Sequence, residues 1–133
     1  MQRIRTRPQF QAAMAGAIVA KTPHFALHRL ALPAPAHGRL LFPEQDSWIG
    51  VVLPKRWAKR AVTRNSIRRQ VYEFTRLSAD SLPAAALVVR LRAGFSREQF
   101  VSATSDVLKR AVRAELQQLF SRLTTKPMTE VAS

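Results

Sequence analysis

The stretch AVTRNSIRRQVYEF, residues 61–74, combines arginines with apolar residues at helical spacing. At about 100° per residue, Ile67, Val71 and Phe74 fall on one narrow arc of an α-helix. A second arc of the same helix holds polar and basic side chains: Asn65, Arg68, Arg69, Tyr72 and Arg76. The spacing therefore predicts a helix over residues 60–76 that buries the first arc and exposes the second.

Runs typical of β-strands lie on both sides of this helix. Residues 48–53, WIGVVL, and residues 85–92, AALVVRLR, are apolar runs of strand length, and residues 24–32, HFALHRLAL, alternate. A brief further strand is expected at Arg39–Phe42, and a turn at 78–83. An amphipathic helix needs a surface to pack on, and a single sheet of about four strands is the surface that the sequence offers.

Capping signals predict two further helices. Thr6 and Gln9 fit the T-x-x-Q capping box, so a helix is expected over Arg7–Ala15. Residues 96–99, SREQ, form a second capping box and predict a long helix that ends near Leu123.

The length of the chain and the order of these elements indicate one domain. A chain of 133 residues can bury one modest core, and neither a repeat nor a linker interrupts it. The expected fold is α+β: a single-domain α/β sandwich over residues 1–123, with residues 124–133, TTKPMTEVAS, as a flexible tail.

The charge of the chain is strongly positive. Lys and Arg number 22 against 8 Asp and Glu, which gives a formal net charge of +14 and favours nucleic acid or an anionic membrane surface as partner. Half of this charge lies between residues 55 and 76, where one acid, Glu73, stands among eight basic residues: Lys55, Arg56, Lys59, Arg60, Arg64, Arg68, Arg69 and Arg76.

A solvated helix face is the ordinary explanation of such a charge run. Solvated faces usually mix signs and so gain pairs four residues apart, and this helix does not. A helix that lies on a membrane would need large apolar side chains exposed opposite the charge, whereas here the apolar arc is narrow and is needed for the core. The pattern therefore favours a nucleic-acid-binding helix.

The sequence offers no catalytic constellation of its own. The carboxylates are scattered singly, except for Glu44 and Asp46 in a loop marked by proline, and cysteine is absent. His24 and His28 would share one face of the strand, but no third metal ligand stands near them in the sequence. We expect the chain to supply binding rather than bond cleavage, and a metal site in the protein is left open.

No apolar run approaches the about 18 residues that a membrane-spanning helix needs. The N-terminal residues are disfavoured as a signal peptide, because Pro8, Gln9 and Gln11 interrupt a run of weakly hydrophobic alanines. A cytoplasmic protein is expected.

The basic stretch resembles a known family signature. Residues 55–74, KRWAKRAVTRNSIRRQVYEF, closely resemble the signature of the bacterial ribonuclease P protein subunit, an Arg-Asn-Arg helix preceded by paired basic residues. Arg64 and Asn65 match its first two positions, and Ile67, Arg68 and Arg69 match the apolar-basic-basic continuation. Ser66 departs from the second arginine of the family. Two further segments support the resemblance: residues 3–30 and residues 48–56.

The resemblance implies a fold and an activity. Members of this family form an α/β sandwich with a left-handed crossover through the basic helix. They assemble with a large catalytic RNA that removes the 5′ leader from precursor tRNA, with magnesium held mainly by the RNA. The resemblance thus implies ribonuclease P RNA and precursor tRNA as partners, and neither a membrane nor a further protein.

The resemblance also implies site residues. The basic helix would face the RNA subunit through Arg60, Arg64, Asn65, Arg68, Arg69 and Arg76. A cleft between the first helix and the sheet would accept the single-stranded leader, bordered by Phe10, Met14, Phe25 and His28. Lys55, Arg56 and Lys59 would form the basic end of that cleft.

Several alternatives remain open at the level of sequence. A general RNA-binding or ribosome-associated module would explain the charge equally well, whereas a helix-turn-helix DNA reader is disfavoured because the arginine helix lies between two strands. A self-sufficient nuclease is disfavoured by the scattered carboxylates. Phe10 and Phe25 suit a core as well as a stacking role, and Trp57 is expected to fasten the basic helix onto the sheet.

Overall fold

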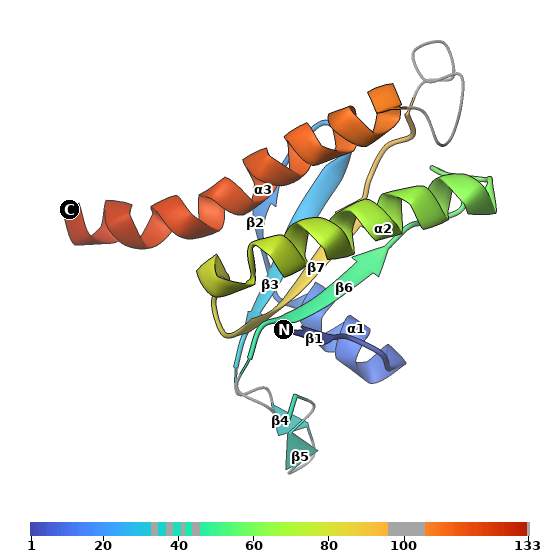
Figure 1. Ribbon diagram of the computed structural model, residues 1–133. Coiled ribbons are helices and arrows are strands. Elements are labelled where there is room, and N and C mark those ends of the chain that lie inside the picture. The colour runs from blue at the N-terminus through green and yellow to red at the C-terminus, as the bar shows by residue number, and fades with distance from the viewer. Residues whose placement is uncertain (33–34, 37–38, 41, 44–45, 96–105, 133) are drawn as a thin grey trace.

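The computed structural model describes residues 1–32, 35–36, 39–40, 42–43, 46–95 and 106–132 (Figure 1). Five strands form the main sheet: β1 Gln2–Arg3, β2 Ala17–Lys21, β3 Phe25–Ala31, β6 Trp48–Val52 and β7 Ala85–Leu91. Their order is β1-β6-β7-β3-β2. The β1–β6 and β6–β7 pairs are parallel, while the β3–β7 and β2–β3 pairs are antiparallel, so the sheet is mixed.

Three α-helices pack on this sheet: α1 Arg7–Ala15, α2 Ala61–Leu77 and α3 Asp106–Ala132. Figure 1 shows α2 and α3 side by side on one face of the sheet and α1 on the other. A short 3-10 helix, Ala79–Ser81, follows α2, and a small separate hairpin pairs β4 Pro35–Ala36 with β5 Arg39–Leu40. The predicted α/β sandwich is confirmed.

Two strands of the main sheet, β1 and β2, were missed by the sequence analysis, and so was β4 of the small hairpin. β1 has only two residues and no periodicity of its own, and backbone bonds attach it to β6: Gln2 N–H donates to Ser47 O and Ile4 N–H to Ile49 O, both at 2.8 Å. β2 directly follows α1 and pairs with β3 through an irregular register between Ile18 and Ala20. Both strands exist because a neighbouring strand accepts their hydrogen bonds, which a local pattern does not reveal.

The capping box at the start of α1 is present as predicted. The Thr6 hydroxyl accepts from Gln9 N–H at 3.3 Å, and Gln9 Oε1 accepts from Thr6 N–H at 3.1 Å and from Arg5 N–H at 2.9 Å. The second predicted capping box, residues 96–99, lies outside the described residues. Helix α3 continues to Ala132 and so extends beyond its expected end at Leu123.

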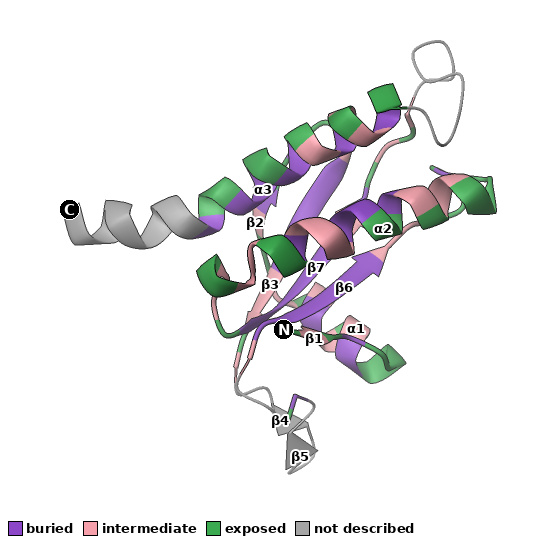
Figure 2. Ribbon diagram, in the orientation of Figure 1, coloured by how far each residue is buried: buried purple, intermediate pink, exposed green. Residues whose placement is uncertain are grey.

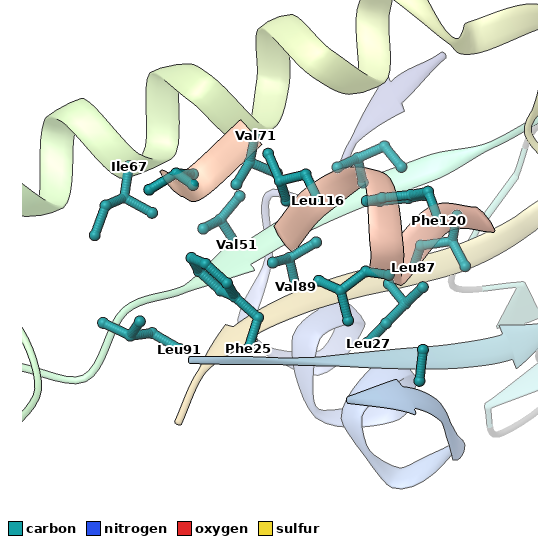
Figure 3. Packing of buried hydrophobic residues seen from close by; sticks show 14 of the residues in the cluster. Phe25, Leu27, Val51, Ile67, Val71, Leu87, Val89, Leu91, Leu116 and Phe120 are labelled. Carbon is teal, nitrogen blue, oxygen red and sulfur yellow. The ribbon is translucent and has the colours of Figure 1, made fainter. Parts of the chain in front are cut away.

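The main core lies between the sheet and the helix pair α2 and α3 (Figure 3). Along β7 the side chains alternate, with Leu87, Val89 and Leu91 in this core and Ala86 and Val88 in a smaller core under α1. The prediction that α2 packs through three apolar residues is confirmed: Ile67 and Val71 are buried, and the partly buried Phe74 packs against Phe120 with ring centroids 5.5 Å apart.

Helix α2 connects two neighbouring parallel strands, β6 and β7. The left-handed sense of this crossover stays a prediction. Within the described residues, none of the helices combines the length and apolar character needed to span a membrane.

Candidate nucleic-acid interface

Helix α2 separates its apolar and basic residues into two faces. The buried residues are Ile67, Gln70, Val71 and Thr75, and Figure 2 shows that the buried side of α2 is turned toward the sheet. On the outer side Asn65, Arg68, Arg69 and Arg76 are exposed, as is Arg60 at the N-cap. The face that carries most of the predicted RNA-binding side chains is thus turned to solvent.

The guanidinium groups on this face lack acidic partners. Among the described residues, no carboxylate forms an ion pair with Arg60, Arg68, Arg69 or Arg76. The one acid of the helix, Glu73, instead faces Arg113 of α3 at 3.6 Å. Arg68 donates to Asn65 Oδ1 at 3.0 Å, which orients a guanidinium without neutralising it. The charge therefore stays available for an external anion such as a phosphate.

Arg64 has a different position from its neighbours. It is only partly exposed, and its Nη1 donates to the carbonyl oxygens of Ala58 and Lys59, both at 2.8 Å. These two bonds fasten the loop that precedes α2, whose own side chains Lys55, Arg56 and Lys59 are exposed. In the free protein Arg64 thus orders the basic loop that the family resemblance assigns to the end of the leader cleft.

Trp57, in the same loop, does not fasten α2 onto the sheet as expected. The residue is 38% exposed, and the Arg56 guanidinium lies over its ring at 5.3 Å from the centroid. The neighbouring Ala58 is the buried residue of this loop. A turn in which Trp57 N–H and Ala58 N–H both donate to Pro54 O leaves the ring outside the core.

A groove of about 430 Å³ lies between the N-terminal strand and the outer face of α2. Its lining residues are Met1, Arg3, Asn65, Arg68, Arg69, Tyr72, Glu73 and Arg76. The Arg3 guanidinium carbon lies 4.1 Å from the centroid of the Tyr72 ring, a close cation–π contact. Burial raises the pKa of Tyr72, although the nearby Arg3, Arg68 and Arg5 oppose this shift, so the phenol stays protonated at neutral pH.

On the opposite face of the sheet, Phe10 and Met14 of α1 lie partly buried over the smaller core. An ideal Cβ placed on Gly50 of β6 would lie 2.6 Å from Phe10 Cε1, so the phenyl ring rests directly on a strand without a side chain. The leader cleft between α1 and the sheet stays a prediction, and Phe10 and Met14 lie partly buried over the smaller core.

His28 lies on this face as well, but as a buried residue. It is 4% exposed, and its ring is held from both sides: Nδ1 lies 3.2 Å from Met14 O, and Nε2 accepts from Arg90 Nε at 3.0 Å. These contacts define the neutral tautomer with the proton on Nδ1. Burial and the charge of Arg90 both lower the pKa of His28, so the ring supports the α1 face and presents little surface of its own.

Phe25 was placed in the leader cleft by the resemblance, and the structure does not bring it there. The ring is 0% exposed and belongs to the main core beneath α2 and α3 (Figure 3). Phe25 and His28 are three residues apart on β3, and an odd spacing along a strand places two side chains on opposite faces. The assignment of Phe25 to the cleft is therefore wrong.

His24 also departs from expectation, because it does not share a face with His28. Its backbone N–H donates to Glu115 Oε1 of α3 at 2.9 Å, its ring Nδ1 lies 2.5 Å from Glu115 Oε2, and the ring stacks on Phe95 at 3.9 Å. His24 precedes β3, so strand alternation does not apply to it. In the described part of the chain, no cluster of three His, Asp or Glu side chains is arranged to hold a metal ion.

Two basic residues near these surfaces were missed by the sequence analysis. Arg3 enters the groove on α2 only because β1 pairs with β6, which no local pattern indicates. Arg90 lies beside His28 on the α1 face. The alternation of residues 85–91 could have located it, because Arg90 falls between Val89 and Leu91, which face the main core.

Comparison with known proteins identifies the family that this chain resembles over most of its length. A family model described as Ribonuclease P matches residues 1–124. The ribonuclease P protein component of Ralstonia pickettii (strain 12J) is 34% identical over 127 residues, which cover 96% of this chain and 81% of that protein. The ribonuclease P protein component of Bordetella parapertussis is also 34% identical, over 125 residues that cover 91% of this chain and 90% of that protein.

Solved structures agree at the level of the fold. The Staphylococcus aureus RNase P protein is similar with a TM-score of 0.66 and 18% identity, covering 91% of this chain and 94% of that chain. The RNase P protein from Thermotoga maritima is similar with a TM-score of 0.63 and 22% identity, covering 92% and 97%. Because the family model spans nearly the whole chain and the relatives match over most of their length, this chain belongs to the ribonuclease P protein family.

Proposed function

We propose that this chain is the protein subunit of a ribonuclease P ribonucleoprotein. In this role it binds the catalytic RNA and the 5′ leader of precursor tRNA, and it thereby promotes the endonucleolytic maturation of the tRNA 5′ end. The observation that carries the proposal is the outer face of α2, where four exposed arginines lack acidic partners among the described residues: Arg60, Arg68, Arg69 and Arg76.

The basic face of α2 is the proposed contact with the RNA subunit. An unpaired guanidinium on a rigid helix can bind phosphate oxygens through two parallel hydrogen bonds, and its position is fixed by the buried side of the same helix. Asn65 adds an amide within this face. Arg64 contributes by ordering the loop that carries Lys55, Arg56 and Lys59, and through the part of its side chain that remains exposed.

The α1 face of the sheet is the proposed contact with the leader. Partly buried Phe10 and Met14 offer apolar surface to bases, and Arg90 lies on the same face of the sheet, where it donates to His28. Arg90 pairs in register with Val52 at the end of β6, and the loop with Lys55 and Arg56 follows that strand. A single strand on α1 would thus meet basic side chains at one end of its path.

Bond cleavage in this proposal belongs to the RNA subunit. Magnesium, bound mainly by RNA phosphates, supplies the metal chemistry of the holoenzyme. The described residues provide binding groups instead: guanidinium forks, an amide and half-exposed apolar side chains. Their effect is to neutralise phosphate repulsion and to hold the substrate in place, so less magnesium is needed for assembly.

Reconstitution of the cleavage reaction tests the proposal. Precursor tRNA is incubated at low magnesium with the protein alone, with a bacterial ribonuclease P RNA alone, and with both, and the cleaved 5′ leader is measured. Only the combination is expected to release it efficiently. Protein that binds the RNA without raising cleavage would indicate a general RNA-binding or ribosome-associated module instead.

A further inference from the structure

The groove between β1 and α2 contains a planar cation that phosphate binding alone does not explain. The Arg3 guanidinium carbon lies over the Tyr72 ring at 4.1 Å from its centroid, while Arg68, Arg69 and Arg76 line the same groove. A flexible N-terminal segment that carries Arg3 would bind a phosphate equally well. Here the backbone bonds of Gln2 and Ile4 to β6, and the buried Ile4 side chain, hold the segment in place.

This arrangement presents a stacking surface next to a phosphate site. The Arg3 guanidinium lies over the Tyr72 ring, and Arg3 is exposed, so the guanidinium is accessible to a further flat group. Bases of unpaired RNA nucleotides stack on guanidinium planes as they do on aromatic rings. Tyr72 is half-buried, and its packing against the main core fixes the position of its ring. The ring therefore supports the Arg3 guanidinium in one place.

The size and charge of the groove fit one nucleotide and its phosphate. A volume of about 430 Å³ lies within the range of small-molecule binding sites. Glu73, the one acid in the lining, faces Arg113 at 3.6 Å, so the groove keeps a large positive excess. A duplex hides its base faces inside the helix, so only an unpaired nucleotide can use a stacking plane beside phosphate-binding arginines.

We propose that this groove binds one unpaired RNA nucleotide, with its base stacked on the guanidinium of Arg3 and its phosphate held by Arg68, Arg69 and Arg76. Arg3 contacts the base, and Tyr72 is a positioning residue that acts through Arg3. The proposal rests on the proposed function and refines it, because it adds base recognition to the charge-based contact of α2. The nucleotide could belong to the ribonuclease P RNA or to the tRNA leader, and both have the same chemistry.

Two probes separate stacking from phosphate binding: single-stranded oligoadenylate and an abasic ribose-phosphate oligomer of equal length. The full-length protein is titrated with each probe, and the affinity for oligoadenylate is divided by the affinity for the abasic oligomer. Arg3→Lys keeps the charge and removes the plane, so this ratio is expected to fall about tenfold while the salt dependence of binding stays unchanged. Arg122→Lys, on the exposed side of α3, is the matched control and leaves the ratio at the wild-type value.

Changes at Tyr72 test the positioning role. Tyr72→Phe keeps the ring beneath Arg3 and is expected to keep the ratio. Tyr72→Leu removes the support and should lower the ratio as Arg3→Lys does, provided that thermal unfolding shows an intact fold. A wild-type ratio in Arg3→Lys, or a wild-type protein that binds both probes equally, overturns the proposal.

Binding of Arg3→Lys to ribonuclease P RNA, to precursor tRNA and to mature tRNA identifies the RNA that supplies the nucleotide. Weaker binding of Arg3→Lys to ribonuclease P RNA assigns the base to the RNA subunit, whereas weaker holoenzyme binding to precursor tRNA but not to mature tRNA assigns it to the leader. Unchanged binding in all three measurements contradicts the inference and leaves the proposed function intact. Failure of the wild-type protein to bind ribonuclease P RNA would instead contradict the proposed function itself.

Discussion

Single residues on the α1 face decide how close the first helix can approach the sheet. Gly50 leaves a gap on β6 that the Phe10 ring fills, with Phe10 Cε1 2.6 Å and two Ile4 carbons 3.2 Å from the position of an added Cβ. His28, on β3, donates from Nδ1 to Met14 O of α1 and accepts at Nε2 from Arg90 of β7. Both residues therefore join α1 to the sheet, and each leads to a prediction.

Gly50→Ala is expected to lower the free energy of unfolding by about 1–3 kcal/mol, because the added methyl group overlaps the Phe10 ring in a packed interface. Urea unfolding of the variant against wild type measures this decrease. In a Phe10→Ala background the penalty should shrink, since the methyl group then meets only Ile4. An equal penalty in both backgrounds would show that Phe10 does not rest on Gly50.

The buried neutral His28 predicts a loss of stability in acid. Its pKa is lowered in the folded state, first by burial and then by Arg90, so the unfolded chain takes up a proton at a higher pH than the folded protein does. The stabilisation is complete above the ordinary histidine pKa of about 6.5 and is lost as the pH falls toward the lowered value.

Urea unfolding between about pH 8 and pH 5 measures this dependence. The variant His28→Gln serves as the comparison. Its amide can donate one hydrogen bond and accept another, but it cannot titrate. The wild-type protein should lose more stability than the variant over this range. Equal losses would mean that the ring of His28 is already solvated in the folded protein.

At the scale of elements, α2 combines a packing face with a binding face. Ile67, Val71 and Thr75 attach it to the core, with the Thr75 hydroxyl donating to Val71 O at 2.9 Å, so the opposite arginines are held on a fixed frame. Helix α3 is fastened independently, through the contact of Glu115 with His24. The charges of α2 can therefore be removed from its exposed face without loosening either helix.

Replacing Arg68 and Arg69 together by Ala should make RNA binding less sensitive to salt. Each phosphate that the protein binds releases condensed counterions, so the slope of log affinity against log salt should decrease in magnitude by roughly 0.7–0.9 for each phosphate that the variant no longer binds. Titration of ribonuclease P RNA at several salt concentrations measures the slope. The double variant Arg110→Ala plus Arg122→Ala, on the exposed side of α3, is the control that should keep it.

At the scale of the whole molecule, the sheet separates two proposed RNA surfaces. The basic face of α2 lies on one side and α1 with Phe10 on the other, and each rests on its own apolar cluster. Substitutions on one side should therefore affect one RNA contact and spare the other, because distant sites contribute independently.

Phe10→Ala should weaken binding of the holoenzyme to precursor tRNA with a leader of several nucleotides by about 1–3 kcal/mol, if one base stacks on this ring. Binding of mature tRNA and of ribonuclease P RNA should stay near wild type. Phe25→Leu is the matched control, because it alters a phenyl ring in the main core and should lower stability without a leader-dependent effect. Equal losses with and without the leader would contradict the cleft assignment for Phe10.

The sequence by itself determined the elements whose signals are local. The capping box at Thr6, the apolar spacing of α2 and the apolar runs of β6 and β7 are set by neighbours within a few residues, and all are present. The basic face follows from the same spacing, because a helix with one buried side must expose the other. The family was readable for the same reason, since its signature, residues 55–74, lies in that helix and in the short segment before it.

The tertiary structure alone decided which distant residues meet. β1 exists because β6 offers it a parallel edge, and only this pairing brings Arg3 over Tyr72. Phe25 became core because α2 and α3 cover the face of β3 to which it points, and His28 became buried because α1 and Arg90 enclose it. Strand alternation tells which residues share a face, but the packing of helices tells which face meets water, and that packing depends on contacts far apart in the chain.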